Sequence, residues 1–349
     1  MLKTPAYAAA TAGAKLTPTI IERRDPGPKD VLLEILYSGI CHSDLHQARD
    51  EWGGAIFPMV PGHEIVGRVT KVGQDVTKFK VGDIGAVGCF VDSCGACPSC
   101  KEDLENFCEA GPAYTYNSTE MDRKTPTFGG YASQVVVREH YVLKVPAGLD
   151  LAATAPLLCA GITTYSPLRQ YNCKKGDRVA VVGLGGLGHM AVKLAASMGA
   201  EVTVLSTSRA KEADARRLGA HGFEVTSEKG VLAKLANRFN LIVDTVSAPH
   251  NLNDYFGTLH HHGTLALVGL PPEALPVEPF SLVSGNRRFA GSNIGGIKET
   301  QEMLDYCAAH GIVCDIEGIQ AHQVNEAYER LVKNDVRYRF VIDAASFRA

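Results

Sequence analysis

Arg178-Val-Ala-Val-Val-Gly183-Leu-Gly185-Gly186-Leu-Gly188 is the stretch that decides the fold class of this chain. It opens with a short, almost wholly apolar run, as strands buried in parallel sheets do. The glycines that follow fit the pattern G-x-G-x-x-G. Apolar residues then recur at helical spacing, at Leu187, Met190, Ala191, Leu194 and Met198. A strand, a glycine turn and a helix in this order are the context in which the pattern indicates dinucleotide binding.

Each glycine of this turn has its own physical task. Gly183 permits the tight turn, Gly185 lets the backbone approach a pyrophosphate, and Gly188 allows the helix to pack closely on the strand. The N-terminus of the helix offers free N–H groups to the anion. The alternative is a glycine-rich turn that binds no ligand, and the strand–turn–helix context argues against it.

The segments that follow this turn alternate between strand and helix patterns. We predict strands over residues 201–205, 241–245 and 264–268 and a helix over 210–218. Alternation of this kind predicts βαβ units and a doubly wound parallel sheet. The fold class is therefore α/β.

The rest of the chain has a different pattern. Short β-rich runs bounded by Gly, Pro or Asp precede residue 150 and predict a barrel-like β domain, with strands at 31–36, 65–69, 84–87 and 134–137. Two helices, 299–309 and 325–333, and a strand, 338–342, close the chain. We expect one domain from residues 1–152 and 295–349 and a nucleotide-binding domain from 153–294.

Composition and charge exclude several classes of protein. The 349 residues suggest two domains at about 150 residues each. The chain has 35 basic and 38 acidic residues, so nothing attracts nucleic acid or an anionic membrane strongly. The uncharged stretch 151–168 is too polar to span a bilayer, and the N-terminus lacks the apolar run of a signal peptide. We expect a cytoplasmic protein without a nucleic-acid or membrane partner.

Four cysteines have a close, metal-like spacing: Cys94-x2-Cys97-x2-Cys100-x7-Cys108. Four thiolates in one loop can converge on a tetrahedral ion, and a closed site of this kind stabilises a loop without doing chemistry. Iron–sulfur clusters use other spacings, and disulfides are disfavoured in the cytoplasm. We therefore predict a structural zinc site.

A second set of metal-ligand residue types lies on two other loops. Cys41-His42-Ser43-Asp44-Leu45-His46 follows one predicted strand, and Gly62-His63-Glu64 precedes another. A catalytic zinc takes three protein ligands and keeps an open position, and Cys159 is the candidate for the third ligand. The alternative for His63 and Glu64 is a hydrogen-bonded pair without metal.

The end of the second strand of the parallel sheet indicates which nucleotide binds. An NAD site carries an Asp or Glu there to hold the ribose hydroxyls, whereas this chain has Leu205-Ser206-Thr207-Ser208-Arg209-Ala-Lys211. Hydroxyl groups and two cations suit a 2′-phosphate, so the sequence favours NADP. The alternative is that Arg209 and Lys211 are merely solvated residues of a first helical turn.

In this order, these motifs make the chain resemble the zinc-dependent medium-chain alcohol dehydrogenases. Within them it is most similar to the cinnamyl alcohol dehydrogenase-like branch, especially the bacterial NADP-dependent aldehyde reductases. The narrower resemblance rests on residues 41–46, 156–167, 291–296 and 336–343. It covers essentially the whole chain, and it implies a GroES-like β-barrel catalytic domain beside a Rossmann nucleotide-binding domain.

The resemblance also implies roles at the predicted zinc site. Cys41, His63 and Cys159 would hold the catalytic zinc, and Asp44 would orient the His63 imidazole. Glu64 would be a carboxylate able to approach the metal during ligand exchange.

A proton relay is implied as well. Ser43 would contact the substrate oxygen, and the relay would run through the cofactor ribose to His46 and solvent. His42 stands where some relatives have an Arg on the pyrophosphate, and a neutral His would bind the phosphate less firmly.

Cofactor and substrate positions complete the expected site. We expect the dinucleotide to contact His42, Thr163, Gly183, Gly185, Gly186, Leu187, Gly188, Ser206, Thr207, Ser208, Arg209, Lys211, Thr245, Val246, Val268, Gly269, Ser292 and Asn293. By resemblance, the substrate pocket includes Trp52, Phe90 and Ile294. Trp52 is the only tryptophan, and its alternative is a structural aromatic residue in a loop.

The predicted activity is reversible hydride transfer between NADPH and aromatic or medium-chain aliphatic aldehydes, with two zinc ions per chain. One alternative is an NAD-dependent zinc polyol or amino-alcohol dehydrogenase. A different class is a zinc-stabilised binding protein without catalysis, but none of the expected ligands is damaged. The intact ligand set also excludes a zinc-free quinone reductase. We expect a homodimer or homotetramer.

Other conspicuous residues carry no predicted chemistry. His260-His261-His262 is expected in an exposed turn before a strand, and Cys307 is expected as a small core residue on a helix. Cys89, Cys173 and Cys314 have no metal-like partners in the sequence.

Overall fold

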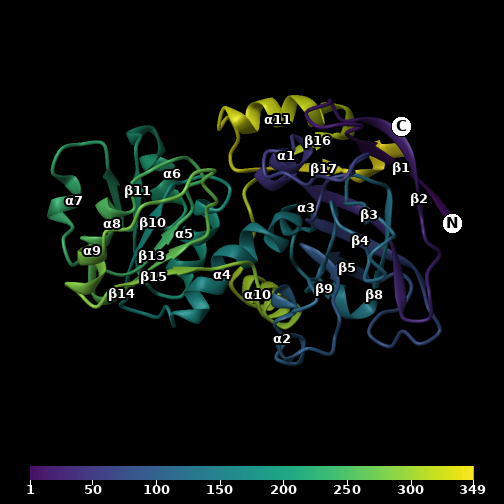
Figure 1. Cartoon of the computed structure of the whole chain (residues 1–349), viewed down its shortest axis with the longest axis horizontal. Helices are drawn as coiled ribbons and strands as arrows, with labels where there is room; N and C mark the ends of the chain where they lie inside the picture. Colours follow the sequence, from purple (N-terminus) through teal and green to yellow (C-terminus); the bar gives the residue numbers. More distant parts are fainter. Residues whose placement is uncertain (349) are drawn as a thin grey trace. The chain divides into compact units, whose positions relative to one another are not determined.

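The computed structural model describes residues 1–348, which form two compact units (Figure 1). The first unit comprises Met1–Cys159 and the described residues from Gly295 onward. The second comprises Ala160–Ile294. The first is rich in antiparallel strands and the second is built on a parallel sheet, as the change of pattern along the sequence predicts.

The second unit contains a six-stranded sheet in the order β12-β11-β10-β13-β14-β15, and every pairing in it is parallel. Its strands are β10 (Arg178–Val182), β11 (Glu201–Ser206), β12 (Gly222–Val225), β13 (Phe239–Asp244), β14 (Leu259–Leu267) and β15 (Arg288–Gly291). The strand order reverses between β10 and β13. Ligands of open α/β sheets bind outside the carboxyl ends of the strands at such a switch point.

Helices accompany this sheet: α4 (Ala160–Gln170), α5 (Gly188–Ser197), α6 (Glu212–Arg217), α7 (Val231–Lys234), α8 (Asn253–Phe256) and α9 (Pro279–Val283). The predicted helix over 210–218 is a short 3-10 turn, η4 (Arg209–Lys211), followed by α6. The apolar face of α5 is fully buried, as its periodicity predicts; Met190, Ala191 and Leu194 have no exposed surface. The expected strand–turn–helix unit is confirmed.

One local prediction in this unit is wrong. Residues 260–262 do not form a turn, because β14 begins at Leu259 and runs through them. Their side chains are exposed, and β14 pairs in parallel with β13 and β15 on either side. Histidines in an exposed part of a strand give no apolar alternation, so the sequence pattern starts only at Thr264.

The first unit contains a seven-stranded sheet in the order β16-β17-β3-β4-β5-β9, with β8 also paired to β3. These strands are β3 (Asp30–Gly39), β4 (Ile65–Val72), β5 (Ile84–Val87), β8 (Gln134–Arg138), β9 (Leu143–Lys144), β16 (Ile316–Gln320) and β17 (Arg339–Asp343). Two ribbons add β1 (Leu2–Ala8) with β2 (Thr17–Arg23) and β6 (Phe90–Asp92) with β7 (Ala113–Tyr114). The predicted strands before residue 150 are all present.

The helical segments of this unit are short except near the end of the chain. They are α1 (His42–Ala48), α2 (Pro98–Lys101), α3 (Leu151–Thr154), α10 (Ile297–His310) and α11 (Val324–Val332), with 3-10 turns η1 (Glu105–Phe107), η2 (Glu139–Tyr141), η3 (Ala155–Leu158), η5 (Ala321–Gln323) and η6 (Ala344–Arg348). β17 pairs antiparallel with β3, Val341 opposite Gly39. The last strand of the chain therefore lies beside the segment that leads into Cys41.

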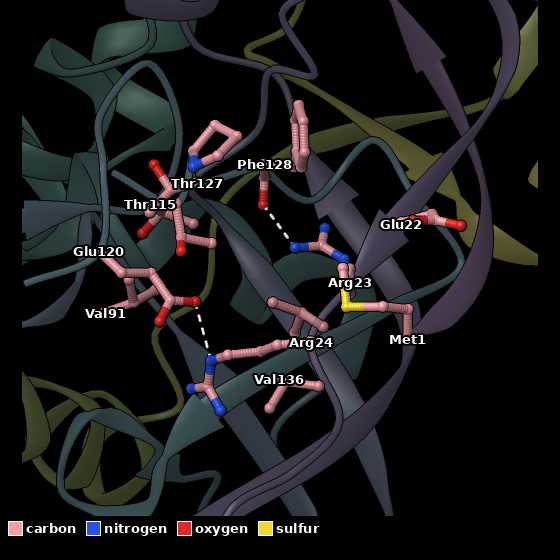
Figure 2. A pocket seen from close by; sticks show the side chains of 13 residues that line it. Met1, Glu22, Arg23, Arg24, Val91, Thr115, Glu120, Thr127, Phe128 and Val136 are labelled. Atoms are coloured by element: carbon pink, nitrogen blue, oxygen red, sulfur yellow. Dashed lines mark hydrogen bonds and ion pairs between the residues drawn. The ribbon is translucent and has the colours of Figure 1, made fainter. Parts of the chain in front are cut away.

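A buried arginine anchors the loop that precedes His63. Arg23 donates hydrogen bonds of 2.8 Å to the carbonyl oxygens of Phe128 and Gly129, and it lines a cavity of about 210 Å³ (Figure 2). Burial lowers the pKa of Arg23 to about 9. The segment after Phe128 pairs in turn with the loop before His63, since Gly130 donates to the carbonyl of Gly62 at 2.8 Å. Satisfying these buried carbonyls holds the loop in place.

No single helix within residues 1–348 is long and apolar enough to cross a membrane. The consecutive segments 151–158 and 160–170 satisfy the length and composition criteria only when they are joined across a bend. Their residues are largely buried in the protein.

Candidate functional site

Four metal-ligand side chains from separate segments converge in the first unit. Cys41 precedes α1, His63 and Glu64 precede β4, and Cys159 follows η3. Their ligand atoms all lie within 4.8 Å of one another, and the Cys41 and Cys159 sulfurs are 3.8 Å apart. Zn–S bonds of about 2.3 Å at a tetrahedral angle place two sulfurs about 3.8 Å apart. The donor set and its spacing therefore fit a zinc ion.

The Asp44 side chain links the segments that carry the ligands of this cluster. Its fully buried carboxylate accepts hydrogen bonds from His63 Nδ1 at 3.0 Å, Gly62 N at 3.0 Å, Cys41 N at 2.9 Å and Tyr131 OH at 3.2 Å. A proton on Nδ1 leaves Nε2 of His63 as the free lone pair for a metal. Burial alone lowers the pKa of His63, but the Asp44 carboxylate outweighs it and raises the pKa well above its usual value.

Glu64 is paired with an arginine that no sequence motif indicates. Arg339 of β17 forms an ion pair with Glu64 and also donates to the Ile40 carbonyl oxygen at 2.8 Å. Burial raises the pKa of Glu64 to about 8, and the charge of Arg339 opposes part of this rise. Arg339 lies 275 residues from Glu64 in the chain, so no local pattern indicates the pair.

A third thiol lies beside this cluster. The Cys89 sulfur is 3.7 Å from the Leu158 carbonyl oxygen, and its thiol interacts with Cys159. The hydrogen bond from the Cys159 thiol lowers the pKa of Cys41 well below its usual value, and the same contact raises the pKa of Cys159. No sequence motif indicates a partner for Cys89, because residues 89 and 159 are brought together only by the fold.

The predicted relay residues lie on α1. The Ser43 hydroxyl is 3.6 Å from the Cys41 sulfur. His46 contacts a Glu51 carboxylate oxygen through Nδ1, and its ring centroid is 5.2 Å from that of Trp52. Glu51 was not predicted, although it lies only five residues after His46. Because Glu51 contacts Nδ1 of His46, Nε2 is the His46 ring nitrogen that can exchange a proton.

The four closely spaced cysteines, which we call the comb, converge at a second point of the first unit; they are Cys94, Cys97, Cys100 and Cys108. Their sulfurs also lie within 4.8 Å of one another, with Cys94 and Cys100 3.9 Å apart. The Cys94 sulfur accepts backbone N–H groups of Ala96 and Cys97 at 3.5 and 3.4 Å, which lowers its pKa to about 6. Sulfurs that accept amide hydrogens are stabilised as thiolates, the form that binds metal. This donor set fits a closed zinc site.

The glycine turn of the second unit leaves space for a ligand. Gly183 has a φ of +85°, which favours glycine. A Cβ at Gly188 would lie 2.2 Å from the Gly183 carbonyl oxygen, whereas a Cβ at Gly185 would meet no protein atom within 4 Å. Gly188 is therefore required by packing and Gly185 borders open space, as the predicted tasks of the two glycines require.

The segment after β11 carries no carboxylate at the position that contacts ribose in NAD sites. Ser206 ends the strand and is 7% exposed. Ser208 caps η4 by accepting from Ala210 N. Lys211 Nζ donates to the Leu184 carbonyl at 3.0 Å, so it lies against the glycine turn. Arg209 instead pairs with Glu228 at 2.6 Å, and a 2′-phosphate would compete with that carboxylate.

The remaining expected cofactor positions are divided between the units. Thr245 and Val246 follow β13, and both would touch a Cβ placed on Gly183. Val268 and Gly269 follow β14, and Thr163 is buried in α4. Ser292 and Asn293 follow β15, Gly186 and Leu187 complete the glycine turn, Thr207 follows β11, and His42 begins α1 of the first unit. The assignment of these positions to the dinucleotide stays a prediction.

The expected substrate residues have different surroundings. Trp52 is 43% exposed, whereas Phe90 is 3% exposed and packs edge-on against Tyr141 with centroids 6.0 Å apart. Ile294 has a φ of +43°, an uncommon backbone conformation for a β-branched residue. The pocket assignment of all three stays a prediction.

Comparison with known proteins identifies the family. Residues 27–147 match the alcohol dehydrogenase GroES-like domain, and residues 186–309 match the zinc-binding dehydrogenase domain. The NADP-dependent alcohol dehydrogenase C 1 of Mycolicibacterium smegmatis is 55% identical over 345 residues, covering 99% of both chains. This chain belongs to the zinc-binding alcohol dehydrogenase family.

Two further relatives narrow the place within the zinc-binding alcohol dehydrogenases. Aldehyde reductase YahK of Escherichia coli is 53% identical over 98% of both chains. A cinnamyl alcohol dehydrogenase structure from Sorghum bicolor has a TM-score of 0.96 at 44% identity, covering 99% of this chain and 98% of that one. The resemblance to the cinnamyl alcohol dehydrogenase-like branch and the GroES-like plus Rossmann fold class are confirmed.

We predict that serine substitutions separate the two cysteine sites. Cys159→Ser removes one ligand of the expected catalytic zinc site of Cys41, His63 and Cys159, which we call the open site. Turnover is therefore lost while the melting temperature changes little. Cys100→Ser opens the closed site of the comb and lowers the melting temperature strongly, because metal binding and loop folding are coupled there. Zinc content, thermal melting and turnover of both variants check this. Equal melting and equal loss of turnover in the two variants would refute the division.

Alanine substitutions test the two roles in the glycine turn. Gly188→Ala pushes a methyl group against the Gly183 carbonyl, so it lowers both the melting temperature and nucleotide affinity. Gly185→Ala meets no protein atom, so it weakens nucleotide binding with an unchanged melting temperature. Differential scanning calorimetry and fluorescence titration measure the two effects. Unchanged NADPH affinity in Gly185→Ala would show that the open space is not where the pyrophosphate binds.

Proposed function

We propose that this protein is a zinc- and NADP-dependent alcohol dehydrogenase that interconverts aldehydes and alcohols. The observation that carries the proposal is the convergence of Cys41, His63 and Cys159 around one point, with Asp44 on the far nitrogen of His63. Three protein donors are the number that leaves a catalytic zinc open to substrate. The names and identities of its relatives support the same activity.

The chemistry of the reaction divides between bound groups and protein. When bound, zinc supplies Lewis acidity toward a carbonyl oxygen and NADPH supplies the hydride. Cys41 and Cys159 add thiolate charge that moderates this acidity, and Asp44 keeps His63 in the ligating tautomer. Arg339 holds the Glu64 carboxylate near the cluster through Oε1. The other oxygen, Oε2, has no hydrogen-bond partner among residues 1–348.

Reduction also needs a proton, because an aldehyde, a hydride and H⁺ give an alcohol. We assign its delivery to Ser43 and His46. The Ser43 hydroxyl is next to Cys41, and His46 is partly exposed and can exchange protons with solvent. In the oxidation of an alcohol the proton moves in the opposite direction.

Domain roles follow from the same proposal. We assign the catalytic role and both zinc ions to the domain of residues 1–152 and 295–349, and nucleotide binding to 153–294. Cys159, which belongs to the first unit of the structure, adds one ligand to the catalytic zinc from just beyond residue 152. The glycine turn of the second unit and the absence of a carboxylate at Ser206 support NADP binding there. For the substrate we propose aromatic and medium-chain aliphatic aldehydes, with Trp52, Phe90 and Ile294 in the pocket.

We also propose that the protein is a cytoplasmic homodimer or homotetramer. β15 lies at an edge of the parallel sheet, and Phe280 and Val283 on α9 are 84% and 71% exposed. An open strand edge and exposed apolar side chains are surfaces that a second copy can cover. None of the ten cysteines, all of which lie within residues 1–348, forms a disulfide, in keeping with a reducing compartment.

The first test is the initial rate of cinnamaldehyde reduction with NADPH and with NADH, on protein of known zinc content. We expect a strong NADPH preference at about two zinc ions per chain, in accordance with the two cysteine-containing sites. Ser206→Asp should shift the preference toward NADH, because its carboxylate would repel a 2′-phosphate and accept from ribose hydroxyls. Ser206→Ala is the matched control, since it removes the hydroxyl without adding charge.

Each other outcome has a definite meaning. Activity with NADH alone would keep the dehydrogenase and overturn the nucleotide assignment. Turnover of sugar alcohols or amino alcohols instead of aldehydes would favour the alternative dehydrogenase. No turnover with any of these substrates would leave a zinc-stabilised binding protein. An unchanged cofactor ratio in Ser206→Asp would place 2′-phosphate recognition elsewhere.

Mutation of α9 tests the assembly. The double substitution Phe280→Glu with Val283→Glu should reduce the molar mass measured by light scattering, because it places two charges on the apolar surface. The wild-type protein should have the mass of two or four chains. A monomeric wild type would contradict the proposed assembly.

A further inference from the structure

A buried carboxylate lies at the switch point of the parallel sheet. Asp244 ends β13 and is opposite Val182, the last residue of β10. It has no exposed surface, and it directly precedes Thr245 and Val246, two of the expected cofactor positions. No sequence motif indicates it. A buried acid at a ligand-binding edge needs partners that satisfy it.

Asp244 organises both loops that leave this edge. Its Oδ1 accepts the backbone N–H of Val246 at 3.1 Å, and its backbone carbonyl accepts from Val268 N at 2.9 Å and Gly269 N at 3.0 Å. The loops are packed closely, since a Cβ on Gly269 would lie 2.3 Å from the Val246 carbonyl oxygen. The shape of one loop therefore depends on the shape of the other.

The second oxygen of Asp244 is held by a histidine from the same loop. His250 Nε2 lies 2.7 Å from Asp244 Oδ2, and Nδ1 lies 2.8 Å from the Ala248 carbonyl oxygen. Both partners are acceptors, so only the doubly protonated imidazolium can donate to both. A charged His250 thus joins the end of the 245–250 loop to Asp244, which precedes the loop, and to Ala248 within it.

We propose that Asp244 and His250 form a latch that holds loops 245–250 and 268–269 in the shape that binds the dinucleotide. The inference rests on the proposed function, because it assigns these residues to the binding of its cofactor. His250 is a positioning residue that acts through Asp244 and the loop backbone. Opening the latch leaves the fold of the sheet intact but lets Thr245, Val246, Val268 and Gly269 move.

The latch makes cofactor affinity depend on pH. The titratable groups that face His250 are Asp244 of β13 and Tyr255 of α8, whose ring centroid is 6.1 Å away. The hydrogen bond to Asp244 raises the pKa of His250, and partial burial opposes the rise. The charged latch is therefore complete at low pH and loses one of its two hydrogen bonds as the pH rises through the pKa of His250. Affinity for NADPH should fall over the same range.

The test is the dissociation constant of NADPH, measured by its fluorescence from pH 6 to pH 9 on zinc-loaded protein, together with thermal melting. His250→Ala should weaken binding about tenfold at low pH, as expected for the loss of one charge-assisted hydrogen bond. It should also remove the part of the pH dependence that belongs to the latch. His250→Gln keeps one side-chain donor. It should therefore bind NADPH slightly more tightly than His250→Ala, and this gain should not depend on pH. His261→Ala, an exposed histidine of β14, is the matched control and should behave as wild type.

The outcomes separate this inference from the proposed function. If wild type does not bind NADPH at any pH, the proposed function fails. If wild type binds and a folded His250→Ala or His250→Gln variant keeps both its affinity and its pH profile, the latch alone is overturned. If His250→Ala does not fold, the decision rests on His250→Gln, which preserves bulk and a donor toward Asp244. A pH dependence of NADPH affinity that the His250 variants share with His261→Ala belongs to the 2′-phosphate and not to the latch.

Discussion

The buried carboxylate of Asp44 is the constraint on which the first unit depends. It accepts hydrogen bonds from Cys41, Gly62, His63 and Tyr131, so it joins the start of α1 to the loop before β4 and to the segment after Gly130. A buried charge without these donors would be very costly. One of these four bonds, from His63 Nδ1, also orients the His63 ring toward the ligand cluster, and those from Cys41 N and Gly62 N hold the backbone next to two of the ligands. Stability and ligand geometry therefore come from one set of contacts, which is why the cluster is preorganised.

The end of the chain completes the same site. β17 pairs with β3 beside Gly39 and carries Arg339 to Glu64. A methyl group on Gly39 would lie 2.0 Å from a Glu64 oxygen, so glycine is needed for the carboxylate to fit. The Arg339–Glu64 pair is almost wholly buried, where removal of either partner leaves an uncompensated charge. Its position next to Cys41 and Cys159 explains why an acid can lie near two thiolates.

The second unit follows the same principle at a different site. Its parallel sheet places the glycine turn and the loops after β13 and β14 at one edge, and Asp244 satisfies the backbone of both loops. Gly188 gives close packing and Gly185 gives open space in the same turn. Each unit thus has a buried acid at its proposed binding surface, for a metal in the first unit and for a nucleotide in the second.

The expected ligands of the open site, Cys41, His63 and Cys159, came from the family resemblance and stay a prediction. The sequence by itself determined the fold class, the glycine turn and the comb of cysteines. These features are local: a strand followed by G-x-G-x-x-G, or cysteines three residues apart, has few other physical uses. The prediction of a turn at residues 260–262 was wrong, because exposed strand residues need not alternate between apolar and polar side chains. Only the tertiary structure decided the pairing of Glu64 with Arg339, the approach of Cys89 to Cys159, the closure of Asp244 on His250, and the diversion of Arg209 to Glu228. Those contacts join residues on different elements or depend on loop conformation, and hydrogen-bond and charge satisfaction in a packed interior has no periodic signature along the chain.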